Sequence, residues 1–325
     1  MYTIDRNTYR VSFPNAFLQG IIQVSMRTLV ILLASASAFA CAGSFPETNW
    51  EQIYIANLVT LEPTRSDTAP PVSQQTPDSV SSLAFWYKAD ALGLANNSAV
   101  GSWTDASGNG RHAVNATGAE QPVYQTGILN AKPALYFDGT DDYLQNNDVA
   151  YTQMTYVAVA KMTTSWNPAW GTFGYRMNVL AQYGDNPQNA SQVYFNWAEV
   201  SGAGKSTVTL RTTVEGYSAI YAGSEINQNQ WYLLIGTYDG QYSRFFLDGT
   251  LTKESDLTPG SVRNASIGFS IGRHTATSGN THQHRFQGYI PEILFYTKAL
   301  STAERQGLEC YLSLKYNLTV PQGCY

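Results

Sequence analysis

Two Asp-Gly dipeptides divide one stretch of the chain into three strand-like runs, and this pattern constrains the fold more than any other feature. The runs cover residues 231–238, 241–247 and 250–253, and Asp239-Gly240 and Asp248-Gly249 stand between them. Asp-Gly tolerates the positive φ angles that a tight hairpin turn needs. The sequence therefore predicts an antiparallel meander here, which indicates an all-β protein.

Further apolar runs of strand length extend this interpretation. Residues 154–160 are almost wholly apolar and β-prone, as expected of a strand buried on both faces, and residues 266–272 and 288–296 add shorter runs. We therefore predict a two-sheet antiparallel β-sandwich. Because Pro291 has no N–H for a ladder hydrogen bond, its strand should lie at a sheet edge or contain a bulge.

The C-terminal part of the chain follows a helical pattern instead. Ser301 with Glu304 three positions later forms a capping box, and Leu308, Tyr311 and Leu312 follow at helical spacing. One amphipathic helix should therefore pack on the sandwich near its C-terminal end.

The N-terminal part contains a leader. The apolar run over residues 28–40 is shorter than the ~20 residues that cross a bilayer. With Met26-Arg27 before it and small residues at Ala38 and Ala40, it is typical of a signal peptide, which we assign to residues 26–40. Residues 1–25 then form an over-extended start, and the mature protein is secreted or held at the cell surface.

Three cysteines remain for an exported chain. Cys310 and Cys324 are close in sequence, so we expect a disulfide that ties down the C-terminal tail and stabilises the fold by ~3 kcal/mol. Cys41 directly follows the predicted cleavage site and is a candidate for acylation. Secretion and lipid anchoring both stay open, and such an anchor is the only membrane contact that we expect.

Residues 41–82 are interpreted as the mature N-terminus and a linker, because prolines stand among Ser, Thr and Gln between residues 60 and 82. From residue 83 to residue 325 no second boundary of this kind and no fixed-period repeat occurs, so this part is interpreted as one domain.

Eight segments of that domain, in this order, resemble the laminin-G-like modules of the concanavalin-A-like lectin/glucanase superfamily, as found in bacterial surface and secreted proteins. They cover residues 83–90, 103–110, 132–144, 246–249, 271–273, 288–296, 300–305 and 311–316. The resemblance implies a jelly roll of antiparallel strands that commonly serves as a binding or interaction module. It implies no single chemistry.

Catalysis is not predicted. Glycosidases of related fold place catalytic carboxylates at positions i and i+2 of one strand, where both lie on the same face. The residue two positions after Glu292 is Leu294, and no Glu-x-Asp-x-Glu motif occurs in the chain. Glu292 is therefore interpreted as a structural hydrogen-bond acceptor, and no catalytic residue is assigned.

Two groups of residues are candidates for binding. Trp166, Trp170, Tyr183 and Trp197 belong to an aromatic-rich segment that could offer flat apolar platforms to sugars, although core filling explains such residues equally well. Asp141 and Asp142 are candidate calcium ligands, and the competing interpretation is a tight turn that includes Asp138. No other cofactor is expected.

The charge balance limits the choice of partner. Nineteen Lys and Arg against 24 Asp and Glu give a net charge of −5, without runs of like charge, so nucleic acid is not an expected partner. The sequence favours an exported, non-catalytic module that recognises extracellular carbohydrate or a surface protein through rim loops. The alternatives are a polysaccharide-cleaving enzyme of the same superfamily and a structural spacer in the envelope.

Overall fold

The computed structural model describes residues 3–5, 8–10, 72–147, 149–163, 177–182, 193–199, 206–212, 220–256, 268–273 and 285–325. The chain divides into two compact units, Met1–Arg65 and Ser66–Tyr325. In the first unit, β1 (Thr3–Asp5) pairs antiparallel with β2 (Thr8–Arg10). The predicted signal peptide and Cys41 lie outside the described residues.

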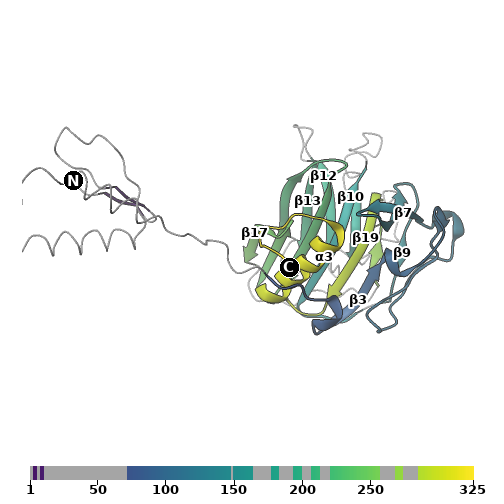
Figure 1. Cartoon of the computed structure of the whole chain (residues 1–325), viewed down its shortest axis with the longest axis horizontal. Coiled ribbons are helices and arrows are strands. Elements are labelled where there is room, and N and C mark those ends of the chain that lie inside the picture. Colours follow the sequence, from purple (N-terminus) through teal and green to yellow (C-terminus); the bar gives the residue numbers. More distant parts are fainter. Residues whose placement is uncertain are drawn as a thin grey trace, which may run out of the picture. The chain divides into compact units, whose positions relative to one another are not determined.

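The second unit is a sandwich of two antiparallel sheets (Figure 1). The nine-stranded sheet has the order β17 (Thr250–Asp256), β16 (Tyr242–Leu247), β15 (Trp231–Tyr238), β10 (Met154–Met162), β19 (Gln287–Tyr296), β8 (Lys132–Asp138), β7 (Val123–Leu129) and β4 (Ser98–Ala99), and β3 (Leu83–Lys88) also pairs with β19. The eight-stranded sheet has the order β14 (Ile220–Ile226), β13 (Ser206–Thr212), β12 (Val193–Glu199), β11 (Met177–Gln182), β18 (Ser270–Ile271), β9 (Leu144–Gln145), β6 (Ala113–Val114) and β5 (Ser102–Trp103). Short 3-10 helices lie at η1 (Pro77–Ser79), η2 (Ala89–Ala91) and η3 (Gly118–Glu120). The predicted all-β sandwich is confirmed.

The predicted meander is formed by β15, β16 and β17. Asp248 and Gly249 both adopt positive φ between β16 and β17 (48° and 78°), as the Asp-Gly pair predicts. Between β15 and β16 only Gly240 does so, because the Asp239 carboxylate instead accepts hydrogen bonds from the next backbone amides. Both turns connect neighbouring antiparallel strands.

Pro291 lies at a bulge in the middle of the nine-stranded sheet. Val159 of β10 stands opposite Glu292, whereas Lys161 stands opposite Tyr289, so β19 contains one extra residue at this point. Pro291 is also where β19 changes neighbour, from β8 on one side of the proline to β3 on the other. Of the two predicted settings, the bulge is confirmed and the sheet edge is wrong.

The main core fills the space between the two sheets. Phe85, Tyr156 and Phe295 of the nine-stranded sheet are fully buried together with residues of the other sheet, such as Trp103 and Ile271. The Phe85 and Phe295 rings stack at 5.2 Å between centroids. This shared core makes the two sheets one domain.

A second core forms where α3 (Thr302–Tyr316) packs on the outer face of the nine-stranded sheet, as Figure 1 shows. Leu308 and Leu312 of the helix are buried with Val159 and Leu294 of the strands. The capping box is present, since Ser301 Oγ accepts from the Glu304 amide and the Glu304 carboxylate accepts from the Ser301 amide. The predicted helix is therefore confirmed.

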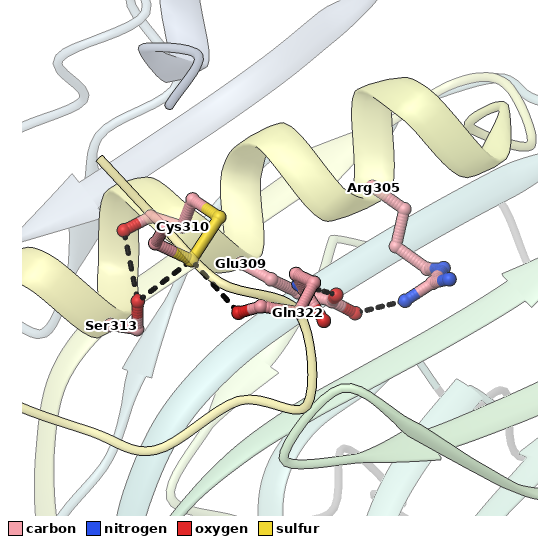
Figure 2. The surroundings of a disulfide bond; sticks show 6 residues. Arg305, Glu309, Cys310, Ser313 and Gln322 are labelled. Carbon is pink, nitrogen blue, oxygen red and sulfur yellow. Dashed lines mark hydrogen bonds and ion pairs between the residues drawn. A yellow bond between two sulfur atoms is a disulfide. The ribbon is translucent and has the colours of Figure 1, made fainter. Parts of the chain in front are cut away.

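The C-terminal tail is fastened to α3 by the Cys310–Cys324 disulfide (Figure 2), which confirms the predicted pairing. Among the described residues, no helix is both long and apolar enough to cross a membrane.

Part of the predicted linker packs on the sandwich. The Val72 amide donates to the Gly323 carbonyl oxygen of the tail (2.7 Å), and the Gln75 amide donates to the Gly307 carbonyl oxygen of α3 (2.9 Å). Val80 is buried in the second core. These residues precede residue 83 and pack in the same compact unit, Ser66–Tyr325, as the sandwich.

Candidate functional site

The register of the nine-stranded sheet brings four residues into one line across four strands. Trp231 of β15 stands opposite Lys161 of β10, which stands opposite Tyr289 of β19, which stands opposite Tyr136 of β8. All four side chains are partly exposed. We call these four residues the aromatic row.

The aromatic row lies on the same outer face of the sheet that α3 covers elsewhere. Lys161 and Trp231 are each two positions from residues of the second core, Val159 and Leu233, and residues two apart share a face. Trp231 itself packs against that core. The aromatic row therefore belongs to the outer face of the sheet and forms a partly exposed part of it.

The bulge at Pro291 places Tyr289 on this face. Glu292 belongs to the outer face, and strict alternation would turn Tyr289 toward the inner core, but the extra residue reverses the alternation and puts Ile290 there instead. Gly288 permits the close approach that follows, because a Cβ at its φ of +153° would lie 2.1 Å from the Lys161 carbonyl oxygen. Pro291 and Gly288 thus shape the backbone of the row.

The rings of the row lie close enough to act as one surface. The centroids of Tyr136 and Tyr289 are 4.9 Å apart, and those of Trp231 and Tyr289 are 6.2 Å apart. Tyr289 Oη donates to Gln125 Oε1 of β7 at 3.1 Å, which fixes the phenol and extends the polar edge of the row. Together these side chains form an amphipathic strip.

Lys161 is the cation of this strip. Its Nζ lies 4.8 Å from the Trp231 ring centroid and 4.9 Å from that of Tyr289. Within the described part of the chain, this ammonium group makes no hydrogen bond or ion pair. Burial lowers the pKa of Lys161.

Glu292, the acid of β19, is fully buried beneath α3. Trp86 Nε1 donates to Glu292 Oε1 (2.6 Å), and Lys315 Nζ (2.6 Å) and Tyr316 Oη (2.7 Å) donate to Oε2. Burial raises the pKa of this carboxyl, against the pull of Lys315. Glu292 therefore accepts hydrogen bonds from both β3 and α3 and joins the helix to the sheet.

The acidic segment around Asp138 forms a hydrogen-bonded turn. Asp138 Oδ1 accepts from the Thr140 amide (2.7 Å), and Asp142 Oδ2 accepts from the Asp138 amide (2.8 Å). Carboxylate oxygens of Asp138, Asp141 and Asp142 lie within 4.8 Å of one another. Burial, with the neighbouring carboxylates, raises the pKa of Asp142 to about 6. The turn is present, and calcium binding by Asp141 and Asp142 stays a prediction.

A family model described as the concanavalin A-like lectin/glucanases superfamily, the Laminin G 3 model, matches residues 138–304. The chain belongs to this laminin-G-like family. Among curated protein sequences, none matches the chain.

Solved structures with the same general fold are distant in sequence from this laminin-G-like protein. Domain 4 of AbnA, a GH43 extracellular arabinanase from Geobacillus stearothermophilus solved with arabinotriose, is 15% identical with a TM-score of 0.48, over 70% of this chain and 98% of that domain. The binding domain of Paraclostridial Mosquitocidal Protein 1 is 10% identical with a TM-score of 0.51, over 73% of this chain and 53% of that one, so the match spans about half of the toxin domain. At such identities the similarity shows the fold alone.

The four aromatic residues predicted from the sequence are placed only in part. Trp166, Trp170 and Tyr183 lie outside the described residues. Trp197 lies in β12, where it stands opposite Met177 of β11 and Val208 of β13. Their roles in binding stay predictions.

The aromatic row was missed because its members are far apart in the laminin-G-like sequence. A local signal exists, since Lys161 is the charged residue in an otherwise uncharged strand and Trp231 is the partly exposed first residue of an otherwise buried one. These residues become neighbours only through the pairing of β15, β10, β19 and β8.

Proposed function

We propose that this laminin-G-like protein is an exported, non-catalytic module that binds extracellular carbohydrate. The observation that carries the proposal is the aromatic row, in which three neighbouring rings and one ammonium group form a partly exposed strip. Aromatic faces offer apolar platforms to the C–H faces of sugars, while polar groups at their edges take hydroxyl hydrogen bonds. The predicted rim residues Trp166 and Trp170 follow Lys161 closely in sequence, so they are proposed as further contacts.

A binding role also agrees with the position of Glu292. Its two carboxylate oxygens are occupied by Trp86, Lys315 and Tyr316 beneath α3, where they hold the fold together. A general acid or a nucleophile must reach the glycosidic bond of the substrate. Because its oxygens are occupied in this way, Glu292 supports a structural role for itself rather than a role in hydrolysis.

Export is supported by the Cys310–Cys324 disulfide, because disulfides persist in oxidising compartments outside the cytosol. The leader over residues 26–40 supports the same conclusion. We propose a secreted or surface-held protein, and the mass of the mature N-terminus decides whether Cys41 is acylated.

A glycan array probed with the purified protein tests the proposal. We expect binding to a defined set of glycans without their cleavage. Trp231→Ala or Tyr289→Ala should weaken it by roughly 5-fold or more, since losing one stacked ring costs on the order of 1 kcal/mol or more. Tyr242→Ala is the matched control, because Tyr242 is a partly exposed ring at the far end of the neighbouring β15–β16 pair.

The control should leave binding and the melting temperature nearly unchanged. If the wild-type protein binds no glycan, or if folded Trp231→Ala binds as tightly as wild type, the aromatic row is not a carbohydrate site. Release of shorter oligosaccharides from a bound glycan would instead favour the hydrolase.

A further inference from the structure

We propose that the saccharide bound at the aromatic row carries a negatively charged group, which pairs directly with the Lys161 ammonium without a metal ion. This inference rests on the proposed carbohydrate-binding function and adds the chemical class of the ligand. Its basis is a partly buried cation between two aromatic rings, for which the described part of the protein supplies no anion.

Two other partly buried lysines of the domain, Lys315 and Lys298, lie beside carboxylates. Lys315 Nζ lies 2.6 Å from Glu292 Oε2 and 3.1 Å from Asp90 Oδ2. Lys298 Nζ lies 2.6 Å from Glu304 Oε1. Burying part of an ammonium group costs free energy unless a partner offsets it, and at these positions an acid of the same domain does so.

At Lys161 the rings offset only part of this cost. A cation over an aromatic face is only weakly stabilised at an exposed site and more strongly when it is desolvated. The rings offer no hydrogen-bond acceptor to the three N–H donors of the ammonium, and the described residues supply none. Among the described residues, burial is the cause that lowers the pKa of Lys161, and no charged neighbour there contributes.

An acidic sugar would satisfy both features of the strip. Its ring can stack on Trp231 or Tyr289 while its carboxylate or sulfate accepts charge-assisted hydrogen bonds from Lys161, which are about twice as strong as neutral ones. The net charge of −5 gives no general attraction to polyanions. Discrimination between acidic and neutral sugars should therefore come from the contact with Lys161 alone.

The site is separate from the acidic turn that was predicted as a calcium candidate. Asp138, Asp141 and Asp142 lie at and after the end of β8, and no contact between their carboxylates and Lys161 occurs in the described chain. Recognition of the acidic group by Lys161 should therefore persist in a chelator.

The test uses an array of glycans in matched pairs, in which a uronate stands beside its methyl ester and a sulfated glycan beside its unsulfated form, with and without chelator. We expect the wild-type protein to prefer the charged member of a pair by about 10-fold or more under both conditions. Lys161→Gln should reduce the charged member to the affinity of the neutral one while binding of the neutral member is kept.

Lys88→Gln is the matched control, because Lys88 Nζ also lies over an aromatic ring, 3.9 Å from the centroid of Trp86, but outside the aromatic row. This variant should keep the preference. The melting temperature of each variant shows that it is folded.

The possible results separate the two proposals. Equal binding of charged and neutral members, or a preference that survives Lys161→Gln, overturns the ionic pairing and leaves the aromatic row as a site for neutral sugars. A preference that disappears in chelator overturns metal-free recognition. Absence of all glycan binding overturns the proposed function together with this inference.

Discussion

The Cys310–Cys324 disulfide spans 14 positions of the sequence, and replacing both cysteines by serine opens the loop that it closes. In the loop-entropy model, a loop of this length in the unfolded chain is worth ~3 kcal/mol of stability. For a domain of this size, 1 kcal/mol shifts the melting temperature by about 2–4 °C, so the double variant should melt ~6–12 °C lower.

The structure also predicts where the variant loosens first. The Val72 amide is bonded to the tail at Gly323, whereas the Gln75 amide is bonded to the helix at Gly307. Without the disulfide the tail is held by contacts such as Gln322 Nε2 to Glu309 Oε2 (2.6 Å), drawn in Figure 2. Local opening of the tail should therefore expose Val72 and leave Gln75 protected.

Denaturant unfolding and amide hydrogen exchange of the double variant measure both effects. Reductant should destabilise the wild-type protein and have little effect on the variant, which controls for the third cysteine, Cys41. A loss of less than about 0.5 kcal/mol would show that the loop is already restrained in the unfolded state. Equal exchange at Val72 and Gln75 would show that the tail and helix open as one unit.

Two further predictions concern buried carboxyl groups. Glu292→Gln should lower the free energy of unfolding in denaturant by about 3–5 kcal/mol, because it leaves the largely buried Lys315 ammonium without its closest acid. Tyr316→Phe removes one hydrogen-bond donor and should lower it by about 1–3 kcal/mol. A larger loss for Tyr316→Phe than for Glu292→Gln would contradict this network. The Asp142 carboxyl holds its proton more tightly when folded, with a pKa of about 6 against 3.8, so its contribution to stability is present below pH 3.8 and is lost as the pH rises through about 6. Asp142→Asn should therefore flatten the melting temperature across this pH range, and an unchanged slope would refute the assignment.

The features that could be predicted from the sequence are those encoded within a few residues. The Asp248-Gly249 turn needs positive φ at two adjacent positions, and Ser301 with Glu304 forms a cap within one helical turn. The disulfide was predictable because its two cysteines close a short loop. In each case the interacting groups are neighbours in the chain, so no knowledge of the rest of the fold is needed.

The features that escaped prediction depend on register between distant segments. Whether Pro291 marks an edge or a bulge depends on having β10 on one side and on the change from β8 to β3 on the other. That choice decides the face on which Tyr289 lies, because one extra residue reverses the alternation of the strand. The aromatic row can therefore be recognised only once the strand pairing is known.

Two kinds of side chain cover the apolar outer face of the nine-stranded sheet. Beneath α3 the strands present Val159 and Leu294, and the one acid there, Glu292, has three donors around it. Beyond the helix the same face presents amphipathic rings and Lys161, side chains that cover apolar surface while keeping polar ends near water. Covering the apolar surface of the sheet explains the rings and the lysine stem. The ammonium of such a lysine is stabilised when an acid lies nearby, as it is at Lys315. Lys161 differs in that its ammonium lies between two rings of a partly exposed strip with no acid beside it in the described chain, and this arrangement is the one that we propose to bind an acidic sugar.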